Sequence, residues 1–266
     1  MEHASAFTPS VLERWRRREN LLPGLALLVL AAAGWAFVVY QVAAMGGMGS
    51  AMGGMTMSGI GGIVLFLSTW MVMMVAMMVP ATLPLILLYS TIARNRLSLV
   101  RARVGMVTLL VGYVAVWAAA GLPVYAYNSL AGAAGSLAAA MPALLLVVGG
   151  AYQFTLLKRI CHVRCSSPLY FLMQNWRPGA TGALRLGMLH GIDCVGCCAG
   201  LMVGLVGLGM MNLAWMFTAA VIIFAEKTIP NSHRVARPLG IVMVAGGVVL
   251  LATALLIGKS PGMASM

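Results

Sequence analysis

Long apolar runs alternate with short basic clusters along the whole chain. An α-helix needs about 20 apolar residues to cross a hydrocarbon core of roughly 30 Å, and most of these runs approach or exceed that length. The runs at 142–157 and 213–225 are shorter, and the second reaches spanning length only if it continues past Glu226 and Lys227. The pattern predicts seven transmembrane helices, at residues 21–45, 60–88, 104–127, 142–157, 186–208, 213–225 and 239–257.

Four basic clusters orient these helices. They lie at 14–18, 94–103, 158–185 and 227–237, and two apolar runs separate each cluster from the next. All four therefore reach the same side of the membrane, and the excess of Lys and Arg in inner loops identifies that side as the cytoplasm. The amino terminus is predicted to be cytoplasmic and the carboxyl terminus to lie outside.

The runs form one predicted domain, so the fold class is an all-α polytopic protein of the cytoplasmic (inner) membrane. The cytoplasmic segment at 161–185 contains a stretch that we expect to be interfacial or re-entrant. The predicted parts are a basic cytoplasmic tail at 1–20, a helical membrane domain at 21–258 with a methionine-rich outer loop at 45–59, and a short tail at 259–266.

Composition and charge narrow the class of protein further. The chain is 62% hydrophobic and 8% charged, whereas about a quarter of the residues in soluble domains are charged. A separate soluble domain is therefore excluded. The net charge of +12 would suit nucleic acid, but the basic residues are confined to the ends of the apolar runs. We expect membrane lipid, with anionic headgroups at the basic clusters, as the partner, and no nucleic acid.

The run at 186–208 carries potential metal ligands. At about 100° per residue, His190, Cys194, Cys197 and Cys198 fall within roughly a third of the helix circumference and share one face. Thiolate and imidazole groups suit Cu(I) or Zn(II). Small cysteines also pack well between helices, which is the competing interpretation. Three cysteines following a histidine on one face favour metal or redox chemistry.

A second group of soft ligands lies in "CHVRC", where Cys161 and Cys165 enclose a histidine. Both groups are predicted on the reducing cytoplasmic side, where structural disulfides rarely persist. The neighbouring Lys158, Arg159 and Arg164 favour the thiolate form of these cysteines. The two groups can approach each other in the fold, but their spacing alone does not bring them together.

The carboxylates are scarce and lie inside or at the edge of apolar runs. Beyond Glu19 the chain has only Asp193 and Glu226, and a charge facing lipid there costs at least about 2.5–3.5 kcal/mol. Both are therefore predicted to face the protein interior. Asp193 is a candidate metal ligand or partner of one. Glu226 either forms a salt bridge with Lys227, balances charge or carries a coupled proton.

Methionine is the third kind of soft ligand. In an exposed outer loop its thioether is a poor hydrophobe but a suitable ligand for Cu(I) at an oxidising face. A glycine-rich linker with methionines in the membrane interface is the alternative. Methionine stripes at 71–78 in the next run indicate flexible packing or a metal relay. The candidate ligands of the loop are Met45, Met48, Met52, Met55 and Met57.

Four segments between residues 70 and 230 resemble a known family: "MMVAMMVP", "GGAYQFTLLKRICHVRC", "GMLHGIDCVGCCAGLM" and "EKTIP". They are similar, in this order, to a bacterial family of predicted metal-binding integral membrane proteins, a domain of unknown function. The resemblance implies metal binding through the three cysteines of "CVGCC" and through His190, and it does not include the methionine-rich loop. Family members usually carry Trp after the cysteine pair. This chain has Ala199 there, so packing beside the site is expected to differ.

These features predict a membrane protein that binds a soft metal, above all copper(I), with zinc as the alternative ion, and transports or delivers it. The chain has no Walker motif, so transport would be passive or driven by an ion gradient. No catalytic residues are assigned. The alternatives are an accessory or assembly subunit of a larger membrane metalloenzyme, with other membrane subunits or a metallochaperone as partners, and a thiol or haem redox protein.

Overall fold

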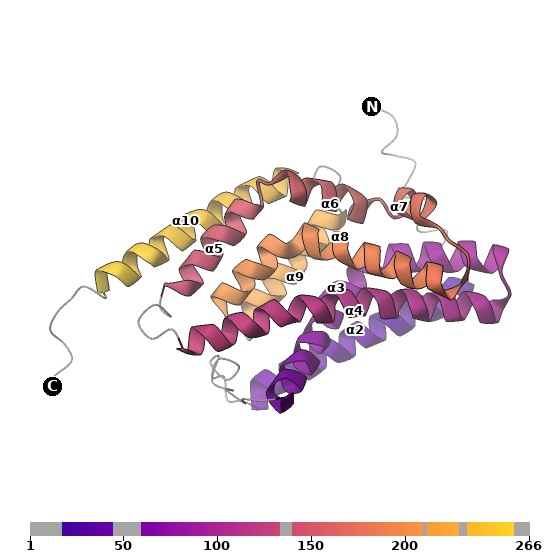
Figure 1. Cartoon of the computed structure of the whole chain (residues 1–266), viewed down its shortest axis with the longest axis horizontal. Coiled ribbons are helices and arrows are strands. Elements are labelled where there is room, and N and C mark those ends of the chain that lie inside the picture. Colours follow the sequence, from indigo (N-terminus) through magenta and orange to yellow (C-terminus); the bar gives the residue numbers. More distant parts are fainter. Residues whose placement is uncertain (1–17, 45–59, 134–139, 210–211, 229–232, 258–266) are drawn as a thin grey trace.

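The computed structural model describes residues 18–44, 60–133, 140–209, 212–228 and 233–257, and its regular structure is helical throughout these ranges (Figure 1). The methionine-rich loop and most of both predicted tails lie outside the described residues. In chain order the helices are α2 (Arg18–Ala44), α3 (Ile60–Arg96), α4 (Leu99–Ala133), α5 (Met141–Tyr152), α6 (Leu156–Ser166), α7 (Pro168–Asn175), α8 (Gly179–Leu208), α9 (Leu213–Thr228) and α10 (His233–Ile257).

Five of these helices are long and apolar enough to cross a membrane, namely α2, α3, α4, α8 and α10. The pair α5 and α6 is a sixth candidate if it is taken as one span bent by 67°. α9 continues past Glu226 to Thr228 but has only 16 residues, fewer than a perpendicular crossing needs. The described part of the chain is thus an all-helical multi-pass membrane protein with five or six candidate spans, where the sequence predicted seven helices.

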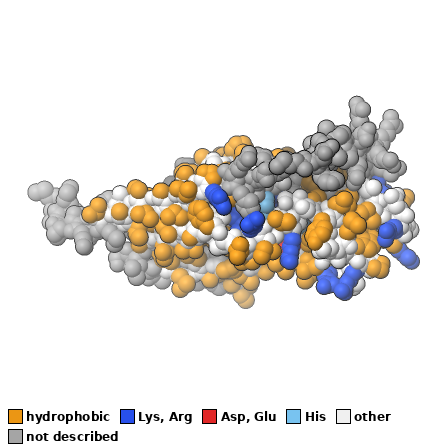
Figure 2. Space-filling view, turned by 90° about the horizontal axis from the view of Figure 1, so that it is seen from above, with side chains coloured by type: hydrophobic (Ala, Val, Ile, Leu, Met, Phe, Trp, Pro, Cys, Tyr) orange, Lys and Arg blue, Asp and Glu red, His pale blue; other side chains and the backbone are white. Residues whose placement is uncertain are grey.

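The surface agrees with a membrane environment. Figure 2 shows a face covered largely by hydrophobic side chains, with Lys and Arg gathered in a few places. Large apolar residues such as Val29, Tyr40 and Val249 are exposed along the candidate spans. A soluble protein rarely exposes contiguous apolar patches on this scale, whereas lipid tails cover them without cost.

α8 is held closely against α4 and α5 by glycines. The backbone of Gly187 packs directly against the Leu109 carbonyl of α4, where any side chain at position 187 would collide. Gly200 of α8 and Gly149 of α5 also pack backbone against backbone. A Cβ added to either glycine would lie 2.5–2.6 Å from the carbonyl oxygen of the other. Small residues permit this close approach of transmembrane helices. α8, which carries three of the five cysteines, therefore has a fixed place in the bundle.

The larger of two hydrophobic core clusters contains all five cysteines. Methionines predicted to form stripes on α3 lie in the same cluster, and Met78 is fully buried. Unbranched thioether side chains suit such irregular spaces between helices. The methionines of this cluster are Met73, Met74, Met77, Met78, Met202, Met216 and Met243.

Candidate metal centre

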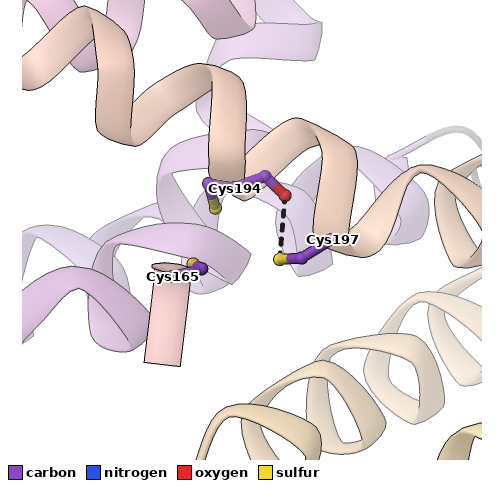
Figure 3. Close-up of side chains that lie close together, drawn as sticks. All are labelled: Cys165, Cys194 and Cys197. Atoms are coloured by element: carbon purple, nitrogen blue, oxygen red, sulfur yellow. Dashed lines mark hydrogen bonds between the residues drawn. The ribbon is translucent and has the colours of Figure 1, made fainter. Parts of the chain in front are cut away.

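Three cysteine side chains from two helices meet in the interior (Figure 3). Cys194 and Cys197 stand one turn apart on α8, and Cys165 comes from the last turn of α6. Their sulfur atoms all lie within 4.8 Å of one another. All three residues are buried, with exposures of 8% or less. The two cysteine groups of the sequence thus meet in the fold through these residues.

Cys194 receives polar contacts from two further helices. Lys227 of α9 donates a hydrogen bond from Nζ to the Cys194 sulfur at 3.0 Å, and the Tyr113 hydroxyl of α4 lies 3.2 Å from the same atom. The Cys194 carbonyl oxygen accepts hydrogen bonds from the thiols of Cys197, at 3.1 Å, and Cys198, at 2.9 Å. The ammonium group of Lys227 stabilises negative charge on the Cys194 sulfur.

The remaining sequence candidates lie outside this group of three. The Cys198 thiol is directed at the carbonyl oxygen of Cys194, and the Cys161 sulfur packs against Gly196, where an added Cβ would come within 2.6 Å of it. His190, one turn before Cys194, is buried at 2% exposure. The outer-loop candidates Met45, Met48, Met52, Met55 and Met57 fall outside the described residues.

His190 is buried without hydrogen-bond partners. Neither of its ring nitrogens is paired with another group among the described residues. Its ring stacks on Tyr113, with 5.9 Å between ring centroids, and meets Phe171 edge-on at 5.4 Å. A buried polar group without a partner costs about 1–3 kcal/mol, so its presence in a native fold calls for an explanation such as a bound ion. Tyr113 connects this imidazole to the sulfur of Cys194.

The buried Glu226 forms an ion pair with a residue distant in sequence. Lys158 Nζ of α6 lies 3.0 Å from each Glu226 carboxylate oxygen, and it also donates to the Gln153 side-chain oxygen. Lys158, Glu226 and Gln153 are all at most 5% exposed. The salt bridge considered between Glu226 and Lys227 is therefore replaced by a longer-range one, and Lys227 turns to Cys194.

Asp193 also has a basic partner. Its Oδ1 lies 3.8 Å from the Arg164 guanidinium of α6, whose side chain is largely exposed. Two of the three basic residues expected to act on the α6 cysteines, Lys158 and Arg164, thus pair with carboxylates, and no such partner is found for Arg159 among the described residues. In the part of the chain that the structure describes, a cysteine receives its contact from a positive charge on a different helix, at Lys227.

Sequence reasoning did not identify Lys227 and Tyr113 as parts of the site. A single Lys at the end of an apolar helix is typical of a side chain that extends to the membrane interface. A tyrosine in a transmembrane run carries no charge and is common there, so its position alone does not indicate a functional site. The signal for Lys227 was its position next to Glu226 in a run too short to span. There was no comparable signal for Tyr113.

An apolar cavity of about 360 Å³ adjoins the cysteine-bearing turn of α8. Val195 and Ala199 of α8 form part of its wall, facing Trp70 of α3 and Trp117 of α4. Ala199, which stands where the resembled family usually has Trp, is one of the residues that line this cavity. Its lining is almost wholly apolar, and it contains none of the three clustered cysteines.

The donor set suits a soft metal ion. Cysteine sulfurs are soft ligands, which select Cu(I) or Zn(II) over hard cations. Structural zinc sites use four ligands in a tetrahedron, whereas the group found in the described residues supplies three sulfurs. The unpartnered nitrogens of His190 offer a further donor one helical turn away. Three sulfurs suit Cu(I), and with His190 as a fourth donor the same residues would also make up the set of three cysteines and one histidine of a zinc site.

Comparison with known proteins favours copper of these two ions. A family model described as PpoB2, copper chaperone, matches residues 67–250, which include α4 to α9 and every residue of the cysteine site. The methionine-rich loop lies outside the matched range. No curated protein and no solved structure matches the chain.

Proposed function

The chain belongs to the PpoB2 copper chaperone family, and from this premise we propose that it binds Cu(I) within the membrane and delivers it to a recipient protein. The observation that carries the proposal is the meeting of the Cys165, Cys194 and Cys197 sulfurs within 4.8 Å in a buried site. Three thiol ligands from two helices form a soft donor set that suits copper. The family and the ligand chemistry therefore support the same ion.

Further residues have supporting roles in this proposal. His190 serves as an additional ligand, which would satisfy its unpartnered nitrogens. Cys161 and Cys198 provide alternative thiols beside the three, and Asp193 balances charge at the cytoplasmic end. The methionines of the outer loop at 45–59 collect Cu(I) on the oxidising side, where thioethers persist as ligands.

The proposed location is the cytoplasmic membrane, with seven crossings and the amino terminus inside. The basic clusters support this orientation because Lys and Arg are retained on the cytoplasmic side. α6 and α7 then lie near the cytoplasmic surface, and the site is within reach of a soluble metallochaperone or a membrane client on that side.

The first experiment measures metal content. The purified protein, expressed in cells grown with added copper and zinc, is compared by elemental mass spectrometry with a Cys165→Ser/Cys194→Ser/Cys197→Ser variant. We expect near-stoichiometric copper in the wild type and none in the variant, because hydroxyl oxygen is a hard and weak ligand for Cu(I). Equal copper in both proteins, or zinc in place of copper, would contradict the proposal.

Lys227 tests the electrostatics of the site. A Lys227→Leu variant keeps an apolar side chain of similar bulk, adds no metal ligand and loses the ammonium that contacts Cys194. We expect its Cu(I) affinity to fall by about 10–100-fold, as is typical when a partner of a metal ligand is removed. Competition with a Cu(I)-selective chelator measures the change. Lys227→Arg, which keeps the charge, should retain most of the affinity. If Lys227→Leu bound Cu(I) as tightly as the wild type, Lys227 would have no such role.

A further inference from the structure

The cysteine site is closed by a ring of contacts among three helices. Cys165 joins α6 to α8 because its sulfur lies within 4.8 Å of the sulfurs of Cys194 and Cys197. Lys227 joins α9 to α8 through Cys194, and the adjacent Glu226 joins α9 to α6 through Lys158. Figure 1 shows α6 at the edge of the bundle, beside α8 and one end of α9. The ion pair between Lys158 and Glu226 therefore completes the ring without contacting the three sulfurs.

The stability of the fold does not explain this ion pair. Both side chains are buried, and removing two charges from water costs about as much as their attraction returns. Replacing such a pair by apolar residues of similar size is often neutral or stabilising. A buried pair that contributes little net stability can still specify one arrangement of the helices that it joins.

α6 depends on its buried face for its position. Its apolar side chains, including Leu156, Ile160 and Val163, are exposed rather than packed against the bundle. The chain bends by 67° at the junction of α5 and α6, so α6 does not continue the packing of α5. The residues that α6 buries are Lys158, Cys161, His162 and Cys165.

We propose that the Lys158–Glu226 ion pair is a positioning device that sets the number of sulfur ligands in the copper site. With the pair formed, α6 is held against α9 and Cys165 completes a set of three sulfurs. With the pair broken, α6 is released at the bend and carries Cys165 away, and α8 alone presents Cys194 and Cys197. The ion is then held by fewer ligands and passes more readily to a recipient. This inference rests on the proposed copper binding.

The decisive variant is Lys158→Leu/Glu226→Leu, which removes both charges together, adds no sulfur and leaves no unpaired charge, although the buried Gln153 side-chain oxygen loses its donor. We expect its thermal stability in detergent to remain close to that of the wild type. X-ray absorption of the Cu(I)-loaded protein should show a decrease from three sulfur ligands to two, with Cu(I) affinity lower by about tenfold or more. The reversed pair, Lys158→Glu/Glu226→Lys, should restore the third sulfur.

A matched control lies on the same helix. Arg164→Gln removes the other ion pair of α6, which is longer and largely exposed, and such pairs contribute little. It should leave the sulfur count and the affinity unchanged. Three sulfurs and wild-type affinity in the Lys158→Leu/Glu226→Leu variant would overturn the inference.

A metal-free measurement separates this inference from the copper proposal. In a Cys161→Ser/Cys197→Ser/Cys198→Ser background, only Cys165 and Cys194 remain to be bridged by dibromobimane, which fluoresces when it links two thiols. We expect efficient bridging, and a large loss of it when Lys158→Leu and Glu226→Leu are added. Unchanged bridging would reject the positioning role even if copper binds. A loss of bridging in a protein whose wild type binds no copper would retain the positioning role and reject the function.

Discussion

A Cys194→Ser variant is expected to lose its bound copper almost completely, while Cys198→Ser keeps most of it. Cys194 lies in the group of three sulfurs and receives the contacts of Lys227 and Tyr113. Its replacement removes a ligand together with the atom on which these partners converge. The loss of Cu(I) affinity should exceed the roughly 10–100-fold that removal of an outer partner costs.

Cys198→Ser is the matched control because it makes the same chemical change one turn along the same helix. Its thiol donates to the Cys194 carbonyl oxygen, and a serine hydroxyl can make the same hydrogen bond. Copper content by elemental mass spectrometry and affinity by chelator competition report both variants. If Cys198→Ser lost as much copper as Cys194→Ser, Cys198 would be a ligand, as the sequence motif predicts. The group of three sulfurs in the fold would then not be the ligand set.

A Gly187→Leu variant is expected to lose the folded state, or nearly so. The Gly187 backbone packs against the Leu109 carbonyl of α4, and a side chain there would have to displace backbone rather than a flexible side chain. Overpacking of a core costs about 1–3 kcal/mol even when side chains can adjust. Because α8 carries Cys194 and Cys197, separating it from α4 should also remove copper binding.

The measurement is thermal unfolding of the purified protein in detergent, followed by circular dichroism, with size-exclusion chromatography for aggregation. Gly246→Leu on α10 serves as the control, because a Cβ at that position meets no atom within 4 Å. Leucine also favours the helix over glycine by up to about 1 kcal/mol. A melting temperature for Gly187→Leu close to that of Gly246→Leu would contradict this prediction, because it would show that the α4–α8 contact accommodates a larger side chain at little cost in stability.

The helical membrane class was predictable because it depends on composition and run length, which are local properties. The shared burial of His190, Cys194, Cys197 and Cys198 was also predictable, since the periodicity of one helix determines which residues share a face. Periodicity does not determine which neighbouring helix covers that face. The choice of Cys165 over Cys161 as the third sulfur therefore required the fold.

The run at 142–157 shows a second limit of the sequence pattern. Its apolar residues suggested one crossing, but α5 ends at Tyr152 and the chain bends before α6. The polar Gln153 and Lys158 near this bend have their partners within the protein, at each other and at Glu226. Hydropathy averages over such pairs, because it counts a buried charge and an exposed charge alike.

The three helices around the sulfurs are synthesised in a fixed order. During synthesis α6 emerges first, then α8, then α9, so Cys165 is made before Cys194 and Lys227 last of all. A nascent chain that has inserted α8 but not α9 contains the three thiols without the ammonium that contacts Cys194 and without the carboxylate that pairs with Lys158 of α6. On the proposed function, such an unfinished chain would bind the ion more weakly than the complete one, so loading would be favoured after α9 has been inserted.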